Sequence, residues 1–210
     1  MFDHAACAIA AILTAALVAG VAPQQSKAAE PRSVEVEGTQ FEVTLTDGRI
    51  LRSPELVGAT LAISTSGGPI RLHIDAVERD PDAKNPPVWL HSFSTDAPDG
   101  SFHNLCEAGP DGRRQGFPLA FRPRSDGALE PAEAGSFELV CTGGARGKCV
   151  RFGYLPWTSA EMREVYNAWV RMVRVDYCGE REGTTRTGTL MGHYDAVDVE
   201  EPGAGSDVRV

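Results

Sequence analysis

The segment FEVTLTDGRI, residues 41–50, decides the architecture expected for this chain. In it Phe41, Val43 and Leu45 alternate with polar residues, and a period of two is typical of a strand with one buried face. The pair Asp47-Gly48 follows, which favours a tight turn between two strands. The segment therefore predicts an antiparallel hairpin.

Strand patterns extend from this hairpin in both directions. Alternation runs from residue 34 to residue 77 and is broken at Gly67-Gly68-Pro69, which is a turn signal. A chain of this kind predicts a mainly antiparallel sheet with one solvent-facing side. Further short strands are predicted over 88–93, 117–121, 137–141, 149–155 and 189–197.

One segment near the C-terminus has a helical period instead. Thr158 and Glu161 predict a capping box at its start, and Gly179 predicts a stop after its end. The predicted fold class is α+β: a mainly antiparallel β-sheet packed with one C-terminal amphipathic helix and stapled by disulfides. The apolar stripe of the helix recurs at spacings of three and four, at Met162, Val165, Tyr166, Trp169, Met172 and Val173.

Length and charge limit the organisation of the chain and its partners. Its 210 residues, 42% of them hydrophobic, suit a single β-rich domain over residues 30–198. Residues 199–210 form an acidic, glycine-rich tail that we expect to be disordered. The net charge of -9 argues against a nucleic-acid partner, because binding to phosphates needs a basic surface.

The N-terminus carries an uninterrupted apolar or small stretch from Ala5 to Ala22. Ser26 and Ala28 follow it, with the small side chains that a signal-peptidase site requires. We therefore expect residues 1–28 to be a signal peptide, cleaved after Ala28 or, alternatively, after Ala22. A retained membrane anchor is the other interpretation, although the stretch is dominated by alanine. Cleavage would leave an extracytoplasmic protein, periplasmic or secreted, without a membrane segment.

Cysteine usage agrees with export. Beyond the signal lie four cysteines, Cys106, Cys141, Cys149 and Cys178, and an even number in an oxidising compartment predicts two disulfides. The glycine-rich turn in CTGGARGKC, between two expected strands, favours a bond from Cys141 to Cys149, which would leave Cys106 to Cys178. Three connectivities are nevertheless possible for four cysteines. A zinc site is the alternative, but the spacing lacks any CxxC pair.

The sequence assigns no catalytic, cofactor-binding or metal-binding residue. Two His-x-Asp pairs, His73 with Asp75 and His193 with Asp195, would each share one face of a strand, where a carboxylate can orient an imidazole. A solvated strand face is the simpler interpretation. The pairs keep one alternative open, a hydrolase or cell-wall enzyme that uses a His-x-Asp pair.

Longer motifs in the C-terminal half resemble those of a known family. CTGGARGKCVRFGYLPW at 141–157, RMVRVDYCG at 171–179 and TTRTGTLMGHYD at 184–195 are similar to segments of bacterial ADYC-domain proteins, within a region of about 88–198. The naming motif has valine in place of its alanine, at Val175. The resemblance implies an extracytoplasmic bacterial domain of uncharacterised function, and it supplies no catalytic residue or cofactor.

Charged residues at the end of the predicted helix suggest an ion-pair or anion site. Arg171, Arg174 and Asp176 lie in the same motif, where cations also complement the helix dipole. We favour ion pairs that anchor the helix end, with an anion site as the alternative. The sequence thus predicts an exported, non-catalytic envelope or secreted module that binds an unknown envelope protein or ligand, or that has a structural role.

Overall fold

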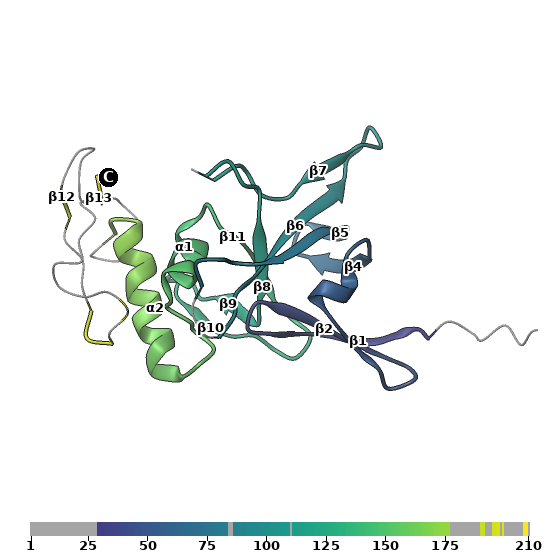
Figure 1. Cartoon of the computed structure of the whole chain (residues 1–210), viewed down its shortest axis with the longest axis horizontal. Helices are drawn as coiled ribbons and strands as arrows, with labels where there is room; N and C mark the ends of the chain where they lie inside the picture. Colours follow the sequence, from purple (N-terminus) through teal and green to yellow (C-terminus); the bar gives the residue numbers. More distant parts are fainter. Residues whose placement is uncertain are drawn as a thin grey trace, which may run out of the picture.

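The fold is built around one central antiparallel sheet, which has a smaller sheet on one face and helices on the other (Figure 1). The predicted α+β class with mainly antiparallel strands is therefore confirmed. The computed structural model describes residues 29–83, 86–109, 111–176, 190–191, 195–197, 199 and 208–209.

Five strands of the central sheet follow one another in space. Their order is β11 (Glu138–Cys141), β8 (Gly116–Leu119), β6 (Trp89–Asp96), β5 (Gly68–Arg79) and β4 (Thr60–Thr65). A short strand, β7 (Phe102–Asn104), pairs with the end of β6. β4 and β5 form a hairpin at the turn that the glycine signal predicted. β11 and β4 are the two edges of this order.

The smaller sheet covers one face of the central sheet. It consists of β1 (Pro31–Glu37), β2 (Gln40–Leu45) and β3 (Ile50–Arg52), and the 3-10 helix η1 (Ser53–Leu56) follows it. β2 and β3 are the hairpin predicted from residues 41–50. Their apolar residues and those of β5 and β6 form a first buried cluster, made of Phe41, Val43, Leu45, Leu56, Leu72, Ile74 and Phe93.

Helices and a short ribbon cover the other face. They are α1 (Ala145–Phe152), α2 (Ala160–Val173), β9 (Phe121–Pro123) and β10 (Leu129–Pro131). In Figure 1 the helices lie to the left of the central sheet. The second buried cluster includes Leu90, Phe117, Leu119, Val140, Val150, Tyr154, Tyr166 and Trp169. Because β6 and β11 contribute to both clusters, these strands lack the predicted solvent-facing side, and all four residues of β8 are buried.

The last strands lie near the C-terminus. β12 (Leu190–Met191) pairs with β13 (Val208–Arg209). Of the strand predicted over 189–197, residues 190–191 are strand and the described residues 195–197 are not. Most of the tail over 199–210 lies outside the described residues.

Residues 145–152 form a helix, so the hairpin predicted around CTGGARGKC is wrong. β11 pairs with β8 instead of residues 149–155. Gly153 ends α1 at φ 115°, a left-handed conformation that favours glycine. Gly147 lies so close to β11 that a Cβ there would be 2.3 Å from the carbonyl oxygen of Cys141. The glycines therefore serve a tight junction between a strand and a helix.

α2 is the predicted C-terminal amphipathic helix. Its apolar stripe packs on the second cluster, with Tyr166 and Trp169 buried. Ser159 caps the helix in place of Thr158, because its hydroxyl accepts a hydrogen bond from the amide of Met162 at 2.9 Å. The predicted start was thus off by one residue.

α2 ends in a turn that glycine usually makes. Val175 adopts φ 60°, and the amide of Asp176 donates to the carbonyl of Arg171 at 2.9 Å, which closes the helix. A β-branched residue is rare in this conformation. Gly179, the predicted stop, lies outside the described residues.

A buried polar chain connects the smaller sheet to the central sheet. The hydroxyl of Ser53 accepts a hydrogen bond from the amide of Phe41 at 2.8 Å and forms a second one with Nε2 of His91, 2.7 Å away. The ring of His91 is fully buried and stacks on Phe93 with centroids 5.0 Å apart. Burial lowers the pKa of His91 from 6.5 to about 4, so the ring is neutral at neutral pH.

We predict that the free energy of unfolding falls as the pH is lowered from 6.5 to about 4. His91 binds a proton more readily in the unfolded chain, where its pKa is ordinary, so acid favours unfolding. The loss due to His91 approaches roughly 3 kcal/mol below both pKa values, at about 1.4 kcal/mol for each pH unit. Urea unfolding over this range measures it. A His91→Leu variant should show a flatter dependence above about pH 5, where carboxylates titrate little, and equal slopes in the two proteins would contradict the prediction.

Candidate functional site

A large groove lies beside β4, and we call it the β4 groove. Its volume is about 1170 Å³, at or above the upper end of the roughly 300–1000 Å³ of most small-molecule sites. It is lined by β4 and its turn, by β11 and the residues before it, and by parts of β1 and β5. The lining residues are Pro31, Val34, Thr60, Leu61, Ala62, Ile63, Ser64, Thr65, Ser66, Ile70, Leu105, Gly135, Ser136, Phe137, Leu139 and Cys141.

The walls of the β4 groove are apolar and uncharged. Leu61 and Ile63 of β4, with Phe137 and Leu139, line the groove and also pack against the first cluster. Of the described residues that line it, none carries a charge, although 23% of the chain is charged. The groove therefore suits a neutral, largely apolar ligand, with serine and threonine hydroxyls available for hydrogen bonds.

His73 belongs to a row of cross-strand contacts on the central sheet. Its Nδ1 lies 2.8 Å from the hydroxyl of Thr60, and its Nε2 lies 2.9 Å from a carboxylate oxygen of Asp96. Phe102 packs edge-on against the ring, with centroids 4.6 Å apart. Thr60 and His73 are register partners, so the row is the pattern expected of neighbours on one sheet face. Phe102 and Asp96 are exposed, and the row lacks the enclosed surroundings in which such groups catalyse well.

A bulge separates His73 from Asp75, its predicted partner. The register of β5 shifts between Ile74 and Ala76, so Asp75 lies at a β-bulge. The carboxylate of Asp75 instead accepts a hydrogen bond from the hydroxyl of Ser94 at 3.0 Å. The carboxylate that orients His73 is therefore Asp96, from a different strand.

The second predicted pair is described only in part. His193 lies outside the described residues. Asp195 accepts hydrogen bonds from the hydroxyl of Tyr154 and from the amide of Val197, the latter at 2.8 Å. The carboxylate of Asp195 thus holds residues 195–197 against Tyr154, just after the end of α1.

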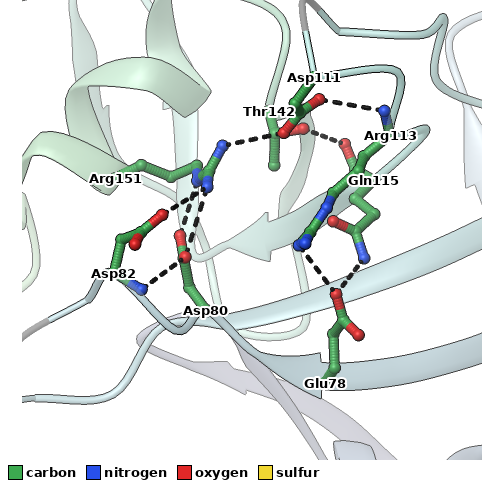
Figure 2. Close-up of polar contacts among 8 residues, drawn as sticks. All are labelled: Glu78, Asp80, Asp82, Asp111, Arg113, Gln115, Thr142 and Arg151. Atoms are coloured by element: carbon green, nitrogen blue, oxygen red, sulfur yellow. Dashed lines mark hydrogen bonds and ion pairs between the residues drawn. The ribbon is translucent and has the colours of Figure 1, made fainter.

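Figure 2 shows a second polar arrangement, which we call the Arg151 cluster. The Nε of Arg151, on α1, is 2.6 Å from Asp80, and its terminal nitrogens are 3.6 Å from Asp82 and 3.5 Å from Asp111. The side chain of Asp80 is fully buried, and its hydrogen bond raises the pKa of Arg151. The cluster ties α1 to the segment after β5 and to the loop before β8.

A neighbouring set of contacts holds that loop to β5. Arg113 and Gln115 both donate to Glu78, at 3.3 Å and 2.8 Å, and the hydroxyl of Thr142 donates to the carbonyl of Gln115 at 3.0 Å (Figure 2). Because the charged groups in Figure 2 already contact one another, we assign them a structural role. A cavity of about 220 Å³ beside Arg151 is smaller than most ligand pockets.

The disulfide connects Cys106 to Cys141, so the favoured pairing of Cys141 with Cys149 is wrong. The pairing of Cys106 with Cys178 is excluded by the same bond, and Cys178 itself lies outside the described residues. α1 turns Cys149 into the second cluster, where its thiol is free and buried, and burial raises its pKa to about 12. A zinc site made from all four cysteines is also excluded.

The three charged residues predicted at the end of α2 lie in different surroundings. Arg171 pairs with Asp126 of the β9–β10 turn at 3.6 Å. Burial raises the pKa of Glu138, and the positive charges of Arg146 and, to a lesser degree, Arg174 oppose this rise. Asp176 is buried, and its Oδ1 has no hydrogen-bond partner among the described residues. No ion pair between Asp176 and either arginine is found in the described part of the chain.

The β4 groove could not be predicted from the sequence, because its walls come from separate segments that only the fold brings together. One signal was present in the sequence. The stretch TLAISTS at 60–66 contains neither a charged residue nor a proline, which is unusual for an exposed strand and its turn.

The disulfide predicts a specific cross-link and a specific loss of stability. Peptide mapping without reductant should recover Cys106 joined to Cys141. Replacing both with serine should lower the free energy of unfolding by about 3–4 kcal/mol, because the bond closes a loop over 35 residues of separation. A Cys149→Ala variant, the control, should retain the cross-link. A peptide that joins Cys141 to Cys149 would contradict the structure.

The Arg151 cluster predicts a contrast between two arginines. Arg151→Met should lower the free energy of unfolding by about 3 kcal/mol, because it leaves the carboxylate of Asp80 buried without its cation. Arg113→Met, the matched control, removes a pair with the exposed Glu78 and should cost less than about 1 kcal/mol. Adding Asp80→Asn to Arg151→Met should restore part of the loss. Equal losses in the two single variants would show that the assigned structural role is wrong.

Comparison with known proteins gives a family and no characterised relative. The family model of the ADYC domain matches residues 53–209, which is well over half of the 210 residues. The match begins at the first residue of η1, so β1–β3 precede it. No curated protein and no solved structure matches the chain. The resemblance inferred from the sequence motifs is thus confirmed, and the chain belongs to the ADYC-domain family.

Proposed function

We propose that this protein is an exported, non-catalytic binding module that holds a ligand or a protein partner in the β4 groove. The observation that carries the proposal is the groove itself. It has about 1170 Å³ of space with uncharged, largely apolar walls that open onto the first buried cluster. Apolar surface left open to water at this scale is typical of binding sites.

Binding is favoured over catalysis by the polar groups of the described part. The charged side chains of the Arg151 cluster are committed to one another. The imidazole of His73 lies between Thr60 and Asp96 on an open sheet face, and the carboxylate of Asp75 hydrogen-bonds to Ser94 instead. The described residues that line the β4 groove have hydroxyls but no acid, base or cation for a reaction.

Export is supported by two independent features. The first 28 residues have the apolar stretch and the small residues of a signal peptide. The Cys106–Cys141 disulfide fits an oxidising compartment. In the described residues, no helix has both the length and the apolar character needed to cross a membrane. We therefore propose that the protein works in the cell envelope or outside the cell.

The proposed function predicts that the β4 groove takes up a neutral apolar compound. Nile red, an uncharged fluorophore, should bind the protein with a blue-shifted emission. Ser136→Arg, at an exposed position on the groove wall, should weaken this binding at least about tenfold, because it brings a charge into an uncharged groove.

Ile50→Arg is the matched control for this experiment. It adds the same charge and removes an exposed apolar side chain on β3, which does not line the groove. It should leave Nile red binding unchanged. Equal loss in both variants, or no binding by the original protein, would count against the β4 groove as a ligand site.

A further inference from the structure

We infer that the β4 groove takes an extended, uncharged peptide segment of another protein, which adds to the central sheet as a strand beside β4. This inference rests on the proposed function and names the chemistry of the partner. It follows from the free backbone edge of β4, from the absence of charged residues and proline in β4, and from the shape of the groove next to it.

The backbone of β4 has one edge that no other described strand pairs with. β4 pairs with β5 across a two-residue turn, so hydrogen-bonded and non-bonded pairs alternate outward from that turn. By this alternation, the backbone N–H and C=O groups of Leu61 and Ile63 form hydrogen bonds with β5. Those of Thr60, Ala62 and Ser64 point to the free edge. No backbone hydrogen bond to this edge is found within the described residues. An added strand would satisfy these groups.

β4 also lacks the features that keep edge strands from pairing. Edges are usually protected by charge, proline or a bulge. β1 has a proline, an arginine, two glutamates and a bulge, and β11 contains Glu138. β4 is six residues long and has none of these features. The other strands at described sheet edges, apart from β1 and β11, have three residues or fewer.

The lining of the groove sets the character of the added segment. Side chains of a strand alternate between its two faces. Every second side chain of a strand beside β4 would therefore point into the groove. There it would lie next to Leu61 and Ile63 and pack against Phe137 and Leu139. A charged residue there would lose its water without gaining a partner. The complementary segment is thus uncharged, with apolar residues at alternate positions.

A second copy of this chain fits the groove less well than a single strand. The groove has β4 on one side and residues 135–139 with β1 on the other. One extended segment can lie between two walls. A second copy would bring β5 bonded behind its own β4, and this second strand would also have to be accommodated beside the opposite wall.

Calorimetric titration with capped six-residue peptides tests the inference on the full mature chain. The peptides have valine, isoleucine, leucine or phenylalanine at alternate positions and serine or threonine between them, and the best binder is used further. Ala62→Pro should raise its Kd at least about tenfold, because proline removes an N–H from the free edge while leaving the bonds to β5 intact. Ala62→Ser keeps that N–H and should bind as the original protein does. N-methylation of alternate peptide amides should abolish binding when the methyl groups face β4.

The outcomes separate this inference from the proposed function. Binding that is equal in Ala62→Pro and Ala62→Ser, or that survives N-methylation in both registers, overturns strand addition even when Nile red still binds. Failure of every peptide in the pool overturns it as well. A dimer of the original protein that Ala62→Pro dissociates, seen by light scattering, assigns the edge to a second copy and also overturns it. Thermal melts that match in the two Ala62 variants confirm that both are folded.

Discussion

A sheet with apolar residues on both faces must be covered on both faces, and the rest of this structure follows from that constraint. β8 is buried along its whole length, and β6 and β11 contribute side chains to two separate clusters. The helices with the β9–β10 ribbon supply one cover, and β1–β3 supply the other. Burial on both sides also explains the state of His91, whose ring is neutral because burial lowers its pKa.

The same constraint is met unevenly along the sheet. Pro31 and Val34 of β1 belong to the cover formed by β1–β3 and line the β4 groove. Across the groove, Leu61 and Ile63 of β4 are only partly buried. Cys141 at the end of β11 also lines the groove, and its disulfide with Cys106 joins β11 to the loop after β7. Gly116 of β8 leaves room for it, since a Cβ there would be 3.0 Å from the sulfur of Cys106. One wall of the groove is therefore covalently fixed to the neighbouring loop.

Much of the fold could be predicted from sequence, because its strands and its long helix have clear periods. The alternation at 41–45 and the stripe from Met162 to Val173 are local signals, and both elements form where they were expected. α1 has no clear signal in the sequence, because its eight residues are too few to show a helical period and the glycines around its start are typical of a hairpin turn. The predicted bond between Cys141 and Cys149 is wrong for the same reason, since it depends on a hairpin between these two cysteines. The bulge that separates His73 from Asp75 has no sequence signature in this chain.

The candidate site could not be predicted from the sequence for a different reason. Each wall of the β4 groove is an ordinary segment, and the groove exists only because β4, β11 and β1 all line one space in the fold. Family membership adds no ligand, so the physical account depends on the free edge of β4. Hydrogen exchange resolved at single amides tests it most directly. The amides of Leu61 and Ile63 should be protected in the isolated protein, and those of Ala62 and Ser64 should exchange rapidly. Equal protection of all four amides would show that the edge is already occupied and would contradict the account.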